Sequence, residues 1–424
     1  MRIGIVGGGL AGLTLAWFLD GLHDVVLLEA RPRLGGNADS VQVRCDGRTH
    51  TVDLGVRETA PASFPVWRHV AREVGLTTDD LVTCPSTRTL TREPEPAPAW
   101  VSSAGPGAGS RPVTPDGPVR RALTWFAAEA ARWEAEDLDW DSTLGDALES
   151  GPGDAHRAAD LLCALPASLH GCTLEEARGL SARAAGAPFT GPRRSEDGPP
   201  EVTYLRGGAG ALVHALADDL RTVTVRVGTP LRAITAEGGC FTLVDAVGGL
   251  HSVDAVVLAL PADRARDALA PLAGTEELRG LLAAVAYREL AYALHSDPFG
   301  MPTDRAAWST VNTAVRDGWS ETTAWYGPAY GADLFVSQVT HRAGRPRREL
   351  ARSAYRALLP TPEAIRAQRR LASASHRERL FFAGRPTTPI DTQEAAMASA
   401  AAVAGRLAPD AGRLRRLRHR KEGD

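Results

Sequence analysis

Three glycines close to the start of the chain have the spacing of a dinucleotide-binding turn. Gly7, Gly9 and Gly12 form a GxGxxG pattern between an apolar strand pattern and an apolar helix pattern. In such a turn the first glycine permits a tight bend, the second lets the backbone approach a pyrophosphate, and the third lets the helix pack closely on the sheet. The backbone N–H groups of Leu10 and Ala11, at the start of that helix, would then face the phosphates.

An acidic residue follows at the distance expected for recognition of a ribose. Glu29 ends the second apolar strand pattern, where a carboxylate accepts hydrogen bonds from ribose hydroxyls. Its negative charge disfavours a 2′-phosphate, so this position favours FAD or NAD over NADP. A glycine-rich turn with a surface glutamate is the alternative interpretation.

The segment after this acid distinguishes FAD from NAD. It reads EARPRLGG from Glu29 to Gly36, which closely resembles the ExRxRxGG extension of flavin-containing amine oxidases, phytoene desaturases and protoporphyrinogen oxidase. The resemblance implies that Arg31 borders the ribose and phosphates, and that Gly35 and Gly36 bring a second backbone loop against the FAD diphosphate. Asn37 stands where the family usually has an arginine, so one cationic contact is missing.

A second group of segments resembles the same family in the same order. Thr51–Gly55 is similar to its second strand motif, after which the chain passes the flavin ring, and this implies positions near the ring for Val56, Arg57 and Glu58. Phe64–Trp67 is similar to a bacterial subgroup of NAD/FAD-binding amine oxidase homologues.

The central and C-terminal segments complete the resemblance. Residues 207–212 and 227–234 look like the family's central region, where the backbone at Leu231 would contact adenine. The strand pattern ending at Gly384 would pass the ribitol, and the helix pattern from Gln393 would direct its N-terminus at the N1–C2=O edge of the flavin. A helix dipole there stabilises the negative charge of a reduced flavin. Arg385 replaces an acid that is common in the family.

These segments together imply one set of cofactor-binding residues. The set is Gly7, Gly9, Leu10, Ala11, Gly12, Glu29, Ala30, Arg31, Gly35, Gly36, Asn37, Gly55, Val56, Arg57, Leu231, Ala259, Gly384, Arg385, Gln393 and Ala396.

The resemblance implies an FAD-dependent oxidoreductase of the amine oxidase type. The expected reaction moves a hydride to flavin N5 from a C–N or C–C bond of a small molecule, in specialised metabolite biosynthesis. Many amine oxidases of the family place a lysine close to N5, whereas Lys421 is the only lysine here. An oxidase, a dehydrogenase and a desaturase therefore all stay open. The alternatives are a flavin-dependent isomerase or mutase without net redox change, and a non-catalytic nucleotide-binding homologue.

Catalytic residues have a weaker signal than cofactor residues. His170, at the end of a predicted helix, is a candidate general base, and Arg57 and Glu58 are candidates because of their expected place near the flavin. Aromatic and polar residues from the middle of the chain are candidates for a pocket wall. They are His170, Tyr204, Arg206, Tyr287, Arg288, Trp308, Asn312, Trp325 and Tyr326.

These motifs require a particular architecture. Strand, helix and strand patterns at Ile3–Val6, Leu10–Leu19 and Val25–Leu28 form a βαβ unit. Nucleotide-binding strands at the start, middle and end of the chain imply a domain assembled from separated segments. We predict an α/β fold with two domains: an FAD-binding Rossmann-like domain of the glutathione-reductase type with a βββ crossover, and a substrate domain with a mixed sheet covered by helices.

The predicted boundaries follow from the matching segments. The FAD-binding domain takes residues 1–75, 202–262 and 378–410, and the substrate-binding domain takes 76–201 and 263–377. A loop is predicted from Pro85 to Pro118 and another from Gly186 to Pro200, because both stretches are rich in Pro and Gly. Residues 411–424 are predicted to be a basic, solvated tail.

Composition limits the partners and the compartment. The chain has 424 residues, 44% of them hydrophobic and 23% charged, which is typical of a multidomain globular protein. A net charge of −3 gives no electrostatic reason to bind nucleic acid or an anionic membrane. Five cysteines without a CxxC pair favour a reducing compartment and no metal site. We expect a cytoplasmic protein without a signal peptide or membrane span, with a small-molecule substrate; a homodimer stays open.

Overall fold

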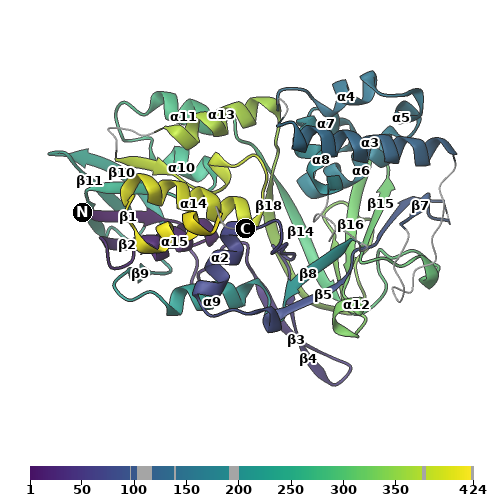
Figure 1. Cartoon of the computed structure of the whole chain (residues 1–424), viewed down its shortest axis with the longest axis horizontal. Coiled ribbons are helices and arrows are strands. Elements are labelled where there is room, and N and C mark those ends of the chain that lie inside the picture. Colours follow the sequence, from purple (N-terminus) through teal and green to yellow (C-terminus); the bar gives the residue numbers. More distant parts are fainter. Residues whose placement is uncertain (96, 103–116, 138–139, 191–199, 375–378, 422–424) are drawn as a thin grey trace.

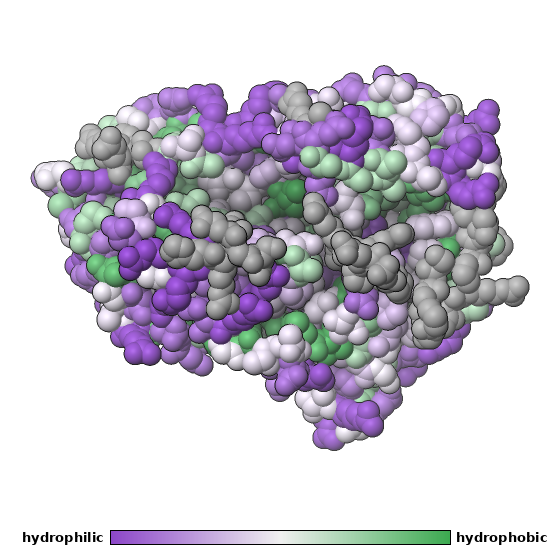
Figure 2. All heavy atoms as spheres, viewed as in Figure 1, coloured by the Kyte–Doolittle hydropathy of each residue, from purple (hydrophilic) through white to green (hydrophobic). Residues whose placement is uncertain are grey.

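Two units lie side by side along the long axis of the molecule (Figure 1). The computed structural model describes residues 1–95, 97–102, 117–137, 140–190, 200–374 and 379–421. One unit is built on a five-stranded parallel sheet and the other on a seven-stranded mixed sheet. On the face drawn in Figure 2, apolar side chains gather in a hollow near the centre, between the two units.

The parallel sheet is assembled from the start, the middle and the end of the chain. Its strands in spatial order are β19 (Leu380–Phe382), β13 (Ala255–Leu258), β1 (Arg2–Val6), β2 (Asp24–Leu28) and β9 (Thr224–Arg226). Side chains alternate between two separate cores: Ile3 and Ile5 pack on one face, whereas Val6 packs on the other. A sheet covered on both faces needs such continuous apolar strands. The prediction of a parallel sheet drawn from separated segments is confirmed.

Helices cover one face of this sheet, and a small antiparallel sheet with further helices covers the other. The first face carries α1 (Leu10–Leu19), α2 (Pro65–Glu73), α9 (Ala209–Asp218) and α14 (Gln393–Leu407). The second face carries β10 (Leu231–Glu237), β11 (Cys240–Asp245), β12 (Leu250–Val253), α10 (Ala262–Ala268), α11 (Glu276–Ala283) and α13 (Pro362–Ser373). The three strands β10 to β12 connect β9 to β13, which is the predicted βββ crossover.

The mixed sheet forms the second unit. Its order is β18 (Glu349–Leu358), β14 (Tyr287–His295), β17 (Phe335–Gln338), β16 (Trp319–Trp325), β15 (Val311–Arg316), β6 (Arg88–Arg92) and β7 (Trp100–Val101). Within the described strands of this sheet, β15 and β6 pair in parallel and the other neighbours pair antiparallel. Helix α6 packs on β15 and β16 within a helical layer (Figure 1). That layer comprises α3 (Gly117–Ala135), α4 (Leu144–Ser150), α5 (Gly153–Arg157), α6 (Ala159–His170), α7 (Leu174–Arg178) and α8 (Ala182–Thr190).

The remaining elements of the described residues are short. They are β3 (Ser40–Cys45), β4 (Arg48–Asp53), β5 (Leu81–Pro85), β8 (Glu201–Leu205), α12 (Gly327–Tyr330), and the 3₁₀ turns η1 (Thr78–Asp80), η2 (Arg305–Ala307) and η3 (Arg385–Thr387).

The predicted loops are partly wrong. Strands β6 and β7 lie within the segment Pro85–Pro118, and α8 continues to Thr190, inside the second predicted loop. Strand β6 forms because it pairs with β15, a partner far along the chain that leaves no local signal in the sequence. Residues 96, 103–116 and 191–199 of the two segments lie outside the described residues.

The predicted solvated tail is also wrong for its described part. Residues Gly412–Lys421 form helix α15, whose Leu414 and Leu417 are buried in the core beside α1 and α14. Arg413 pairs with Asp219 at 2.6 Å and lies over the Trp17 ring at 4.3 Å. The basic composition conceals an apolar stripe at i and i+3, which is the pattern of a packed helix.

This packing predicts a stability effect at the end of the chain. We expect Leu414→Ala to lower the free energy of unfolding by about 2–5 kcal/mol, because it leaves a cavity in the core. Urea unfolding measures the change, and the exposed Arg415→Ala on the same helix is the control. Equal stability of the two variants would mean that α15 is not part of the folded unit.

Candidate active site

The first glycine turn has two glycines that packing requires and one that faces open space. A Cβ on Gly7 would lie 2.3 Å from the carbonyl oxygen of Ala259, and a Cβ on Gly12 would lie 1.8 Å from that of Gly7. A Cβ on Gly9 would meet only the Cα of Gly36, at 3.9 Å. Gly9 therefore leaves room for another molecule close to the backbone.

The start of α1 faces the same space. Gly9 is its N-cap residue and no side chain caps the helix, although Leu10 and Ala11 are buried. Buried helix N-termini need acceptors for their first N–H groups, and together with the helix dipole they favour an anion. The residues present therefore fit a bound diphosphate.

The second glycine loop lies directly on the first. The N–H of Gly35 donates to the carbonyl of Gly8 at 2.8 Å. Gly36 has φ +58°, and a Cβ there would lie 3.1 Å from the Cα of Gly9. The structure thus brings the two glycine motifs of the sequence together.

Glu29 is fixed at the end of β2. It is buried and accepts hydrogen bonds from the backbone N–H groups of Gly8 at 2.6 Å and Arg31 at 2.8 Å. Arg31 itself donates to the carbonyl of Gly36 at 3.0 Å, and Ala30 is exposed. The carboxylate is therefore held beside the glycine turn, where the ribose-binding acid of a dinucleotide site is expected.

The segment predicted to contact adenine and the end of the central strand β13 lie at the same edge of the parallel sheet. The N–H of Thr229, two residues before Leu231, donates to the carbonyl of Glu29 at 2.8 Å. The N–H of Ala259, directly after β13, donates to the carbonyl of Val6 at 2.8 Å. The carboxyl ends of β1, β2 and β13 meet here, and ligands of parallel α/β sheets bind at this edge.

A buried carboxylate joins the second strand motif to the central segment. Asp53 accepts hydrogen bonds from Ser40 Oγ at 2.5 Å and from the N–H of Ala209 at 2.9 Å, which caps α9. Gly208 has φ +70°, and a Cβ there would collide with Ser40 and Asp53. Burial raises the pKa of Asp53 to about 7, against the lowering effect of these hydrogen bonds.

The segment after Asp53 reaches the second glycine loop. A Cβ on Gly55 would lie 2.2 Å from the carbonyl oxygen of Asn37, and the N–H of Val56 donates to that carbonyl at 3.0 Å. Asn37 thus uses its backbone carbonyl in this contact.

The C-terminal segment approaches from the other side. Gly384 has φ +77° and its N–H donates to Ser399 Oγ at 2.8 Å. Arg385 pairs with Asp391 at 2.7 Å and donates to the carbonyl of Arg356 at 2.5 Å. The cation that replaces the family's acid is therefore neutralised within the protein.

The start of α14 is tied to the segment after β4. The buried Gln393 donates through Nε2 to the carbonyl of Glu58 at 2.8 Å and accepts from Trp67 Nε1 at 3.0 Å. Glu394 accepts the N–H of Trp67 at 2.8 Å, at the start of α2, and Ala396 follows in the first turn of α14. Gln393 and Glu58 are thereby brought together from opposite ends of the chain.

The three candidate catalytic residues do not form one cluster. Arg57 lies over the Tyr292 ring at 5.6 Å, and Glu58 beside it has an exposed side chain. His170 bonds through Nδ1 to the carbonyl of Leu358 at 2.7 Å. Burial lowers the pKa of His170, against the opposing effects of this carbonyl and of Asp391, so the imidazole is neutral at pH 7. No hydrogen bond or ion pair links His170 to the other two candidates within the described part of the chain.

Among the other predicted wall residues, Tyr204 and Tyr326 pack on each other, with ring centroids 5.2 Å apart, and both influence the pKa of Arg57. The remaining predicted wall residues make contacts within the protein, and Arg206 among them is exposed.

The Tyr287 hydroxyl accepts the N–H of Ala262, and Arg288 pairs with Glu176. Asn312 bonds to Ser309 and Thr323, and Trp308 packs on Trp325.

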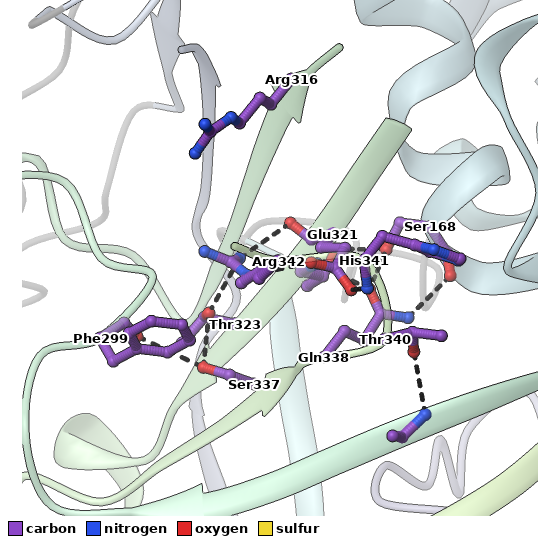
Figure 3. Close-up of polar contacts among 12 residues, drawn as sticks. Ser168, Phe299, Arg316, Glu321, Thr323, Ser337, Gln338, Thr340, His341 and Arg342 are labelled. Atoms are coloured by element: carbon purple, nitrogen blue, oxygen red, sulfur yellow. Dashed lines mark hydrogen bonds and ion pairs between the residues drawn. The ribbon is translucent and has the colours of Figure 1, made fainter. Parts of the chain in front are cut away.

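Sequence reasoning missed Tyr292, Gln338 and Ser168. The Gln338 side chain bonds to Ser168, to the N–H of Thr322 and to the hydroxyl of Tyr292. Figure 3 shows Gln338 beside Ser168, and a second polar pair nearby, formed by Glu321 on β16 and Arg342 in the connection after β17. Residues on separate strands and a helix meet here, and their spacing carries no signal of that meeting.

Comparison with known proteins agrees with this geometry. The family profile described as flavin-containing amine oxidoreductase matches residues 10–345. The chain belongs to this family. It is an FAD-dependent oxidoreductase with the two-domain FAD-binding fold of the flavin-containing amine oxidoreductases. No curated protein sequence matches the chain.

Solved structures of the family resemble the chain over nearly its whole length. A candidate protoporphyrinogen oxidase from Exiguobacterium sp. 255-15 is 18% identical, with a TM-score of 0.62, and the match covers 96% of this chain and 98% of that one. Putrescine oxidase bound to putrescine is 15% identical, with a TM-score of 0.67, covering 96% and 99%. At these identities the likeness shows the fold.

The described residues lack two kinds of feature. None of their helices has the length and apolar character needed to cross a bilayer. They also contain no group of three or more His, Cys, Asp or Glu side chains arranged to hold a metal ion.

Because the space over Gly9 is open, we predict that a side chain at this position weakens FAD binding without destabilising the apoprotein. We expect Gly9→Ala to weaken FAD binding at least about tenfold while the apoprotein keeps its stability within about 1 kcal/mol, because the new methyl group meets only ligand space. FAD titration of the apoprotein measures the affinity. Gly280→Ala, in α11 with nothing near its Cβ, is the control. Unchanged FAD affinity of Gly9→Ala would place the diphosphate elsewhere.

Asp53 predicts a pH dependence of stability. Its folded pKa of about 7 lies above the ordinary 3.8, so the folded protein retains a proton that the unfolded chain loses between these values. The contribution of Asp53 to the free energy of unfolding therefore decreases as the pH rises through this range. We expect Asp53→Asn to flatten the fall in apoprotein stability across that range, measured by urea unfolding at several pH values. A steeper fall in the variant would contradict the assignment.

Proposed function

We propose that the enzyme oxidises a small-molecule amine at the carbon beside nitrogen. The observation that supports this proposal best is the meeting of both glycine loops, the Gly55–Glu58 segment and the start of α14 at the seam between the parallel and mixed sheets. FAD, when bound, supplies the hydride acceptor at N5.

The protein's own groups would bind and orient FAD and the substrate. The start of α1 and the two glycine loops would hold the diphosphate, and Glu29 would hold the ribose. The N-terminus of α14, fixed by Gln393, would stabilise negative charge at one edge of the ring system. The mixed sheet with α6 would form the wall that excludes water from the substrate.

The electron acceptor is a separate part of the proposal. Lys421 is the only lysine of the chain, and it is the last residue of α15, outside the segments that resemble the flavin-contacting segments of the family. We therefore propose that the enzyme uses an acceptor other than molecular oxygen more readily than the lysine-bearing amine oxidases do. His170, neutral at pH 7, would be the candidate base if the substrate must lose a proton.

Anaerobic reduction of the bound flavin tests this function. We expect at least one member of a panel of amines to bleach the visible absorption of the oxidised flavin, since hydride transfer does not need the final acceptor. Reoxidation of the reduced protein by oxygen and by an artificial quinone then compares the acceptors, and we expect the quinone to react faster. Free FAD mixed with the same amines, without the protein, is the control for non-enzymatic reaction.

Two results would contradict the proposal. A purified protein that neither contains nor takes up FAD would exclude it. So would a flavin that no amine reduces but that converts a substrate into an isomer, because such turnover has no net redox change.

A further inference from the structure

An apolar groove lies at the β19 edge of the parallel sheet. It runs between α13, which covers one face of the sheet, and α14, which covers the other (Figure 1). Its volume is about 400 Å³, and its lining includes Phe382 of β19, Ala372 of α13, and Ala402 and Val403 of α14. Pockets that bind small molecules typically measure about 300–1,000 Å³, so this groove has room for a ligand.

The groove is lined by other residues of α14 than those predicted to face the flavin. Its described lining follows α14 from Ala395 to Arg406, over about 16 Å at 1.5 Å per residue, and excludes Gln393 and Ala396. Trp140, from the helical layer of the second unit, also lines it, so both units contribute to the groove. A ligand in this groove would therefore lie lengthwise along α14, outside the proposed FAD site.

The hydroxyl groups on the groove wall are already hydrogen-bonded within the protein. Thr387 and Thr388 donate to the carbonyl of Gly384 at 2.9 and 3.3 Å. Ser399 donates to the carbonyl of Ala396 at 2.7 Å and accepts the N–H of Gly384 at 2.8 Å. A hydroxyl has one proton to donate, and in all three residues it is used. The interior of the groove therefore favours hydrocarbon over a polar group.

The rim of the groove carries positive charge. Arg406, the charged residue among the described lining, is exposed and lies over the Phe381 ring at 4.6 Å. It donates through Nη1 to the carbonyl of Ala374 at 3.3 Å, which uses one of the five N–H groups of a guanidinium. Arg369, also exposed, lies over the ring of Trp140 at 5.7 Å and adds a second cation.

Acids next to the lining residues are paired with other arginines. Asp141, which follows Trp140, pairs with Arg366 at 2.5 Å, and Asp391, which follows Ile390, pairs with Arg385 at 2.7 Å. Within the described part of the chain, neither of the two rim arginines forms an ion pair. The rim can therefore attract an anion, although solvent screens exposed charges, so the apolar interior would supply most of the binding energy.

We propose that this groove binds a free medium-chain fatty acid, with the hydrocarbon chain along α14 and the carboxylate at Arg406. A long apolar interior with a cation at its rim is complementary to a linear molecule that has one anionic end. An amine at the end of the same chain would bring a cation toward the rim arginines, which disfavours binding. The proposal is independent of amine oxidation, because it concerns a different cavity.

Calorimetric titration of the full-length, FAD-loaded protein tests the proposal. The ligands are decanoate, decanol, decylamine and butyrate, all below the concentrations at which they form micelles. We expect decanoate to bind at one site, about tenfold more tightly than decanol, which lacks the charge, and more tightly still than decylamine. Butyrate should bind at least about a hundredfold more weakly than decanoate, because it buries fewer CH₂ groups.

Two sets of variants locate the ligand. Ala402→Phe fills the exposed side of the groove and should lower decanoate affinity at least about tenfold, whereas Ala128→Phe, at an exposed alanine of α3, is its control. Arg406→Gln should remove the preference for decanoate over decanol, Arg406→Lys should keep part of it, and Arg415→Gln on α15 should leave it unchanged. FAD content and thermal unfolding show whether each variant is folded.

Three outcomes would overturn the proposal. Unchanged decanoate affinity of Ala402→Phe would place the ligand elsewhere, and a perturbation of flavin absorption that persists in this variant would place it at the flavin. Butyrate binding as tight as decanoate binding would indicate a simple anion site. A dimer that Ala402→Phe dissociates, in a protein that binds no decanoate, would assign the groove to a second copy of the chain. Flavin reduction by amines is a separate measurement, so each proposal can fail alone.

Discussion

The close approach of two backbone segments at Gly9 and Gly36 is the constraint on which the rest of the structure depends. A Cβ on Gly36 would lie 3.1 Å from the Cα of Gly9, and the loops are joined by the Gly35 to Gly8 hydrogen bond. The contact places the second loop beside the backbone N–H groups at the start of a buried helix. In the proposed site these groups would bind a diphosphate through their dipoles, which requires no lysine, and Lys421 is the only lysine of the chain.

Buried hydrogen bonds join other segments of the candidate site that are far apart in the sequence. Asp53 joins β4 to the start of α9, and Gln393 joins the start of α14 to the carbonyl of Glu58. In both cases the polar groups satisfy each other inside the protein, and separating them would leave buried groups unpaired. Both hydrogen bonds join segments that are far apart in the sequence.

Arg385 and Arg57 differ in how their positive charges are balanced. Arg385 replaces a family acid, and Asp391 neutralises it at 2.7 Å, so the replacement adds no free charge. Arg57 is surrounded by tyrosines and keeps a buried Nη1 atom without a partner. The replacement at Arg385 is therefore balanced by an acid within the protein, whereas no ion pair of Arg57 is found among the described residues.

Local pattern was enough to predict the cofactor and the architecture that binds it. The GxGxxG turn, Glu29 and the EARPRLGG extension combine backbone and charge requirements that few other structures share, and the alternation of apolar strands predicted a parallel sheet from separated segments. Tertiary structure alone decided the rest. Strand β6, the burial of α15, and the cluster of Arg57, Tyr326, Tyr292 and Gln338 all depend on partners far along the chain. Pairing and burial of this kind arise from the packed fold, so the spacing of residues along the sequence does not encode them locally.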